Sequence, residues 1–129
     1  MKEPIWVLDE VVLAIHSMLL AEHGGGNGIR ESSMLDSALA RARQKISYEP
    51  NSSIFELAAA YSFGIAKNHP FVDGNKRTAF TIGVLFLEIN GYILEIPEVD
   101  AAITFESLAA GNISENELVE WFQESSKKA

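Results

Sequence analysis

The residues with the most capacity for chemistry stand together in one short segment, from His69 to Arg77. An imidazole at His69 can take the proton of an attacking hydroxyl at neutral pH. Asp73 is the one carboxylate in the segment, and it suits Mg²⁺, which takes one or two protein carboxylates and leaves its other positions to phosphate and water. Singly, each such residue is most often an ordinary surface residue. Their combination in nine consecutive residues favours a phosphate-handling site.

The apolar run 79–89 predicts a central helix that is covered by other helices and extends behind this segment. At its start we expect Asn75 to be the N-cap and Gly74 to let the backbone approach a ligand closely. The free N–H groups of the first turn favour an anion. Lys76 and Arg77 lie where cations oppose the helix dipole, so pairing with phosphate oxygens explains their position better.

The remaining periodicity predicts an all-α fold, a single compact domain over residues 1–129 built as a bundle of about six helices. Helices are expected over 7–22, from Ser32 or Ser33 to Arg43, from Ser53 to about His69, from the motif to about Asn90, from Pro97 to about Ala110, and after Ser114. The pairs Ser53/Glu56 and Ser114/Glu117 are capping-box patterns at two of these starts. The two central helices should form an αα-hairpin with the motif as its loop.

The segments between the helices carry weaker signals. Gly24–Gly28 is expected to be a flexible loop, and it lacks the Lys-Ser/Thr that follows a P-loop. His16 and His23 are placed on the flank and at the C-terminal end of the first helix, with structural roles. We expect Tyr92–Ile96 to be an extended linker without a strand partner, and Ser125–Ala129 to fray.

Composition excludes several classes of function. The net charge of −8, from 10 basic and 18 acidic residues, argues against a nucleic-acid partner. No run of about 18 apolar residues indicates a membrane span, and the absence of cysteine makes the cytoplasm the expected location. Around the motif, however, three cations (Lys67, Lys76 and Arg77) against Asp73 leave a local charge of +2. This local field favours a small polyanion.

The segment resembles the Fic/Doc family motif His-x-Phe-x-Asp/Glu-Gly-Asn-Gly/Lys-Arg, matched from His69 to Arg77. Lys76 is similar to the Doc (death-on-curing) branch, because the Fic branch usually has Gly there. The segments 28–41 and 86–92 also resemble Doc sequences, and the whole resemblance covers roughly residues 5 to 125.

The resemblance implies ATP and Mg²⁺ as cofactors and assigns roles within the motif. His69 would be the catalytic base, Asp73 the Mg²⁺ ligand, Phe71 a buried anchor of the loop, and Gly74, Asn75, Lys76 and Arg77 the phosphate and nucleotide binders. It further implies a toxin of a toxin-antitoxin pair that phosphorylates a hydroxyl of a target protein, elongation factor Tu, and so arrests translation.

Two alternatives remain open from the sequence. The first is AMP transfer to a Ser, Thr or Tyr of a protein, although Phe80 stands where many Fic AMP transferases carry a second Arg. The second is a non-catalytic module that binds an antitoxin peptide. The chain lacks the internal inhibitory pattern of many Fic proteins, so inhibition is expected from a separate antitoxin. Incompletely buried apolar residues of the outer helices would receive it: Leu8, Ile15, Leu19, Trp121 and Phe122.

Overall fold

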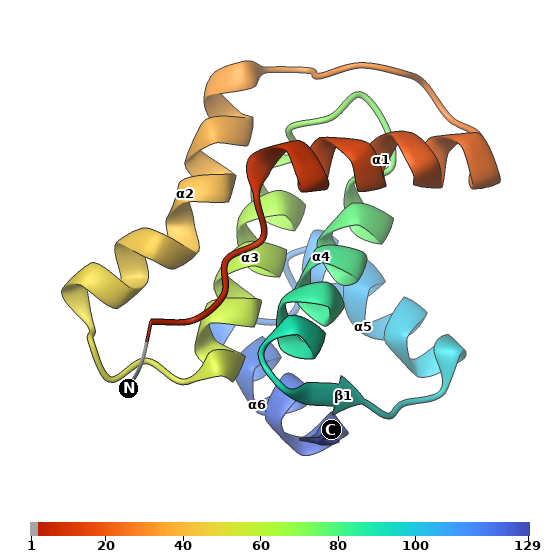
Figure 1. Cartoon of the computed structure of the whole chain (residues 1–129). Coiled ribbons are helices and arrows are strands. Elements are labelled where there is room, and N and C mark those ends of the chain that lie inside the picture. The colour runs from red at the N-terminus through yellow and green to blue at the C-terminus, as the bar shows by residue number, and fades with distance from the viewer. Residues whose placement is uncertain (1–2) are drawn as a thin grey trace.

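Two adjacent helices, α3 (Ile54–Asn68) and α4 (Asn75–Ile89), form the centre of the computed structural model, which describes residues 3–129. The other helices are α1 (Asp9–His23), α2 (Ser32–Tyr48), α5 (Glu98–Ala109) and α6 (Glu115–Ser125). Helices α2 and α6 pack on α3, α1 packs on α4, and α5 contacts both central helices (Figure 1). The predicted all-α bundle with a central helix behind the motif is confirmed. Within the described residues, no helix is both long and apolar enough to cross a membrane.

Small side chains let α3 pack closely against the helices that surround it. Ala58, Ala59 and Ala60 of α3 are all fully buried. The Ser62 hydroxyl, also buried, donates a hydrogen bond of 2.7 Å to the carbonyl of Ala79 on α4. Gly83 faces this hydroxyl, and a methyl group there would overlap Ser62 Oγ and lie 2.8 Å from the ring of Phe122.

We therefore expect Gly83→Ala to destabilise the protein. Overpacking of this kind costs about 1–3 kcal/mol or more, which exceeds the helix propensity that Ala gains over Gly, at most about 1 kcal/mol. Urea denaturation followed by circular dichroism gives the free energy of unfolding. Gly64→Ala is the matched control, because its added methyl would meet its neighbours at 3.1–3.3 Å and should cost less. A Gly83→Ala variant as stable as the parent would contradict this packing.

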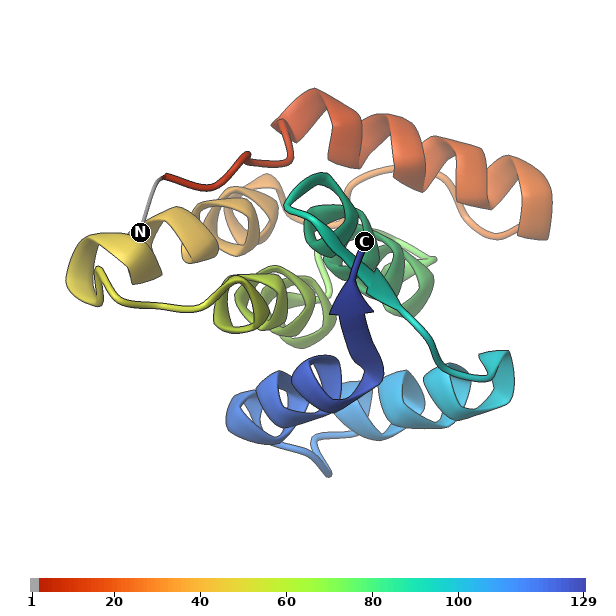
Figure 2. The same ribbon diagram turned by 60° about the horizontal axis from the view of Figure 1, so that its bottom comes forward.

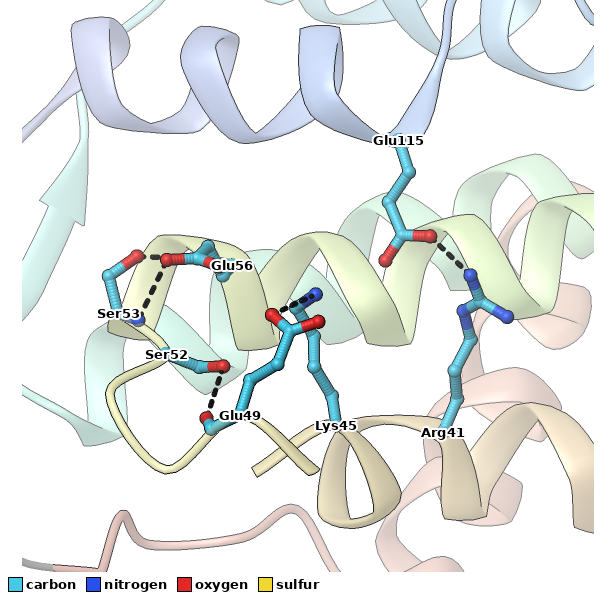
Figure 3. Close-up of polar contacts among 7 residues, drawn as sticks. All are labelled: Arg41, Lys45, Glu49, Ser52, Ser53, Glu56 and Glu115. Atoms are coloured by element: carbon cyan, nitrogen blue, oxygen red, sulfur yellow. Dashed lines mark hydrogen bonds and ion pairs between the residues drawn. The ribbon is translucent and has the colours of Figure 1, made fainter. Parts of the chain in front are cut away.

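Capping boxes begin two helices where the sequence predicted them. The backbone N–H of Glu56 donates to Ser53 Oγ, and the N–H of Ser53 donates to the Glu56 carboxylate, both at 3.1 Å (Figure 3). Ser114 and Glu117 repeat the arrangement at the start of α6. Each box satisfies N–H groups that the first turn would otherwise leave unpaired.

Helix α2 is longer than predicted and begins without the predicted serine cap. Its N-cap is Glu31, with no side-chain hydrogen bond. The helix continues past the expected end at Arg43 to Tyr48, and in its last turns Lys45 pairs with Glu49 at 3.2 Å. Earlier in the helix, Arg41 pairs with Glu115 of α6 (Figure 3).

The chain's last residues form a strand, so two predictions about extended segments are wrong. Strand β1 (Tyr92–Leu94) pairs antiparallel with β2 (Ser126–Lys128), and Figure 2 shows the dark blue β2, which ends at C, next to β1. Hydrogen bonds from Glu95 to Ser125 and from Ala129 to Gly91 extend the ribbon. Segment Tyr92–Ile96 therefore has a strand partner, and Ser125–Ala129 does not fray.

Helix α1 lies on the outside of the bundle and buries little of its predicted apolar face. Its buried residues are Val12 and His16, whereas Leu8, the N-cap, is 51% exposed. On α6, by contrast, Phe122 is fully buried, so the expectation that it stays partly exposed is wrong. Figure 1 shows α1 crossing near the loop that joins α3 to α4.

Candidate active site

His69 is the C-cap of α3 and begins the loop to α4. Its backbone is left-handed, with φ 50° and ψ 54°, and no other non-glycine residue among 3–129 has a positive φ. That conformation costs an L-residue about 1–2 kcal/mol. The Arg30 side chain offsets this cost by donating to the carbonyls of His69 at 2.8 Å and Asn68 at 3.0 Å. Arg30 thus holds the end of α3 and presents the exposed His69 ring.

Asn75 is the first residue of α4, and Gly74, with φ 80°, is the N-cap. The prediction of an Asn75 cap is therefore wrong. Its buried side chain points back into the loop, where Oδ1 accepts from the Phe71 N–H and Nδ2 donates to the Phe71 carbonyl, both at 3.0 Å. The side-chain amide braces the loop, so Asn75 itself can meet an anion only through its backbone N–H.

The same amide determines which nitrogen of His69 carries a proton. Nδ2 of Asn75 lies 3.1 Å from His69 Nδ1. If the Asn75 amide were flipped, its NH₂ group would face the Phe71 N–H and its oxygen would face the Phe71 carbonyl, and neither contact would be a hydrogen bond. The NH₂ group must therefore face the Phe71 carbonyl and His69 Nδ1. Nδ1 therefore accepts, and the proton of neutral His69 is on Nε2.

Asp73 is an exposed carboxylate with both oxygens oriented by backbone N–H groups. Gly74 donates to Oδ1 at 2.8 Å, and Gly26 donates to Oδ2 at 3.3 Å. These bonds hold the pKa of Asp73 below its ordinary value, with smaller contributions from the charges of Arg77 and His69. The carboxylate is thus ionised at neutral pH.

The surroundings of Asp73 fit a Mg²⁺ ion held mainly by phosphate and water. Among residues 3–129 there is no group of three or more His, Cys, Asp or Glu side chains that could hold a metal, and one ionised carboxylate is what a nucleotide-bound Mg²⁺ needs from a protein. The segment Gly24–Gly28, which we expected to be a flexible loop, lies against this carboxylate. A Cβ atom added at Gly25 would lie 2.8 Å from Asp73 Oδ2.

The N-terminus of α4 has no side-chain cap, so its first-turn N–H groups are available to an anion. Arg77 is exposed in this turn and close enough to Asp73 to lower its pKa. Lys76 instead reaches α5, where Nζ donates to Glu106 Oε2 at 2.8 Å. Both partners of this ion pair are largely exposed, and such pairs are worth about 0–1 kcal/mol. A phosphate group can therefore compete for Lys76.

The sequence did not indicate that the side chains of Arg30 and His16 contact the motif. Arg30 had no assigned role, and His16 was placed on a helix flank. His16 is only 4% exposed and stacks on the Phe71 ring with centroids 3.7 Å apart. The one available signal was spacing, since His16 follows the buried Val12 by four residues and shares its helix face.

Comparison with known proteins shows the family of this chain. The model of the Fic/DOC family matches residues 6–87, which include the whole motif. The chain belongs to the Fic/DOC family. A relative from Escherichia phage P1, named "Protein kinase doc", is 33% identical over 106 residues, covering 81% of this chain and 82% of the relative. "Toxin Doc" of Mycolicibacterium smegmatis is 39% identical over 69 residues, 53% of each chain.

In this member of the Fic/DOC family, the motif divides into two groups by burial. Phe71 and Asn75 are buried and hold the loop. His69, Asp73, Lys76 and Arg77 are exposed at the same end of the α3–α4 pair. The exposed group is the part that a ligand can reach.

Proposed function

We propose that this chain is an ATP-dependent protein kinase that acts as the toxin of a toxin-antitoxin pair. The observation that carries the proposal is the convergence of an ionised Asp73, the His69 ring and the uncapped N-terminus of α4 at one end of the bundle. Phosphoryl transfer requires mainly that groups be positioned and that negative charge be neutralised. An exposed, preorganised cluster of this kind supplies both.

Each exposed motif residue has a proposed role. The backbone N–H groups of Asn75, Lys76 and Arg77 at the start of α4, together with the Lys76 and Arg77 side chains, bind the phosphates of ATP, and Gly74 lets the backbone approach them closely. Asp73 holds Mg²⁺, which when bound neutralises phosphate charge and fixes phosphate geometry. His69 takes the proton of the attacking hydroxyl.

The names of the two relatives support a kinase and a toxin, and the resemblance to Doc sequences supports the finer parts of the proposal. The target is a hydroxyl of elongation factor Tu, and its phosphorylation arrests translation in the cytoplasm. Silencing comes from a separate antitoxin peptide, which docks on the outer helices. Leu8 and Met18 of α1 are more than half exposed there, whereas Phe122 is buried and takes no part.

AMP transfer is the second candidate, and the environment of Phe80 weighs against it. In the AMP transferases that carry a second Arg, this position supplies a cation to the γ-phosphate. In this chain the position is Phe80. Its ring instead packs edge-on against Phe105 of α5, with centroids 5.2 Å apart. An apolar ring does not replace a bidentate guanidinium.

Mass spectrometry of purified elongation factor Tu after incubation with the chain, ATP and Mg²⁺ tests the proposal. We expect the target to gain one phosphate. A gain of one AMP would instead establish the alternative reaction. An unmodified target, together with tight binding of the antitoxin peptide, would favour the non-catalytic binding module. The Asp73→Asn variant is the matched control, because it keeps the side chain's size and removes its charge.

A further inference from the structure

His16 is a buried polar residue on α1 whose partners all belong to the motif loop. Its Nε2 lies 2.8 Å from the backbone carbonyl oxygen of Asp73, and its ring lies almost parallel to that of Phe71, at an interplanar angle of 11°. We propose that His16 is a positioning residue that aims the Asp73 carboxylate through the peptide group between Asp73 and Gly74. The proposal rests on the function above only in naming that carboxylate as the Mg²⁺ ligand.

The first step is the hydrogen bond itself. A carbonyl oxygen can only accept, so His16 Nε2 carries a proton and donates it to Asp73 O. A buried polar group is costly unless it is paired, and an apolar side chain could fill the same space without that cost. The imidazole at this position is therefore explained by the bond it makes to the loop.

The second step follows from the planarity of the peptide bond. The Asp73 carbonyl and the Gly74 N–H belong to one rigid group and point in opposite directions. When His16 fixes the carbonyl, it also fixes the direction of the Gly74 N–H. That N–H donates to Oδ1 of Asp73 at 2.8 Å, while Gly26 binds Oδ2. His16 on α1 thus sets the orientation of the Asp73 carboxylate through the planar peptide group between Asp73 and Gly74.

The third step is that His16 itself is held in place. Its ring stacks on Phe71, which is fully buried and bonded through both backbone groups to Asn75. The backbone of Gly74 beside this ring has φ +80°, a conformation that favours glycine. Helix α1 and the loop therefore act as one preorganised support for Asp73.

Two substitutions separate the ring from its hydrogen bond. His16→Phe keeps an aromatic ring against Phe71 and removes the donor, whereas His16→Gln keeps a donor and removes the ring. His23→Phe is the matched control, since His23 is an exposed imidazole in the last turn of α1. Two readouts apply to each variant: amide hydrogen exchange at Gly74 by NMR, and the Mg²⁺ concentration that gives half-maximal ATP binding.

We expect His16→Phe to speed exchange at Gly74 and to raise the half-maximal Mg²⁺ concentration by about two- to tenfold, the worth of one neutral hydrogen bond. Exchange in the α3–α4 core should not change. His16→Gln should recover part of both effects, and His23→Phe should resemble the parent. Unchanged Gly74 exchange in His16→Phe, or equal losses in His16→Phe and His16→Gln, would overturn the proposal. A parent protein that binds no ATP would refute the proposed function, while the exchange result would still decide the role of His16.

Discussion

Replacing His69 with Ala should lower the rate of target phosphorylation by about 10²–10⁴-fold, the usual contribution of a general base. The fold should survive, because the His69 ring is exposed and the Arg30 bonds to the loop involve backbone carbonyls. Rate constants from phosphate incorporation into the target, with ATP and Mg²⁺ saturating, measure the loss. Urea denaturation of the same variant checks that the protein remains folded.

His23→Ala is the control for this experiment, since it removes an exposed imidazole that lies outside the motif. Growth of cells that express each variant without an antitoxin gives a second readout. Parent and His23→Ala should arrest growth, and His69→Ala should not. A His69→Ala protein that phosphorylates its target at the parent's rate would show that the assigned role is wrong.

Removing both cations of the first turn should give the second large effect. A charge-assisted hydrogen bond contributes about 1.5–3 kcal/mol, so the Lys76→Ala/Arg77→Ala variant should bind ATP with Mg²⁺ at least 100-fold more weakly. Arg77 should account for most of the loss, because Lys76 must first leave Glu106. Isothermal calorimetry gives the affinities.

Glu106→Gln is the informative partner variant, because it releases Lys76 without touching the motif. This variant should bind ATP at least as tightly as the parent. Weaker binding would mean that the Lys76–Glu106 pair belongs to the working site. Equal affinity of the parent and the double variant would remove the basis for placing phosphate at this helix.

The hairpin at the centre was predictable because its signals are local. A capping box at Ser53 and an apolar run after the motif lie within single helices. Strand β1 was not predictable, because its partner is far along the chain, with Tyr92 opposite Lys128. Three-residue strands carry too short a pattern to show that pairing.

The same difference between local patterns and long-range contacts explains which residues of the candidate site the sequence indicated. His69, Asp73, Lys76 and Arg77 could be named as candidates because they stand together in one segment. Arg30 and His16 come from other elements, and only tertiary contacts bring them to the motif. Asn75 was misassigned because cap preference is a local statistic, whereas its side chain is committed to Phe71 and His69.

Because of the hydrogen bond from Asn75, the neutral resting form of the proposed base His69 has no free lone pair with which to take up a proton. Neutral imidazole has one lone pair, and here the Asn75 N–H occupies it at Nδ1. The outward nitrogen can then give a hydrogen bond but cannot take up a proton. For proton uptake at Nε2, the ring's own proton must move to Nδ1, and the contact with Asn75 must open at a cost of about 0.5–1.5 kcal/mol. Under the proposed function, ATP bound without a target would face a hydrogen-bond donor at His69 and not a base, so His69 would not activate a water molecule in the site.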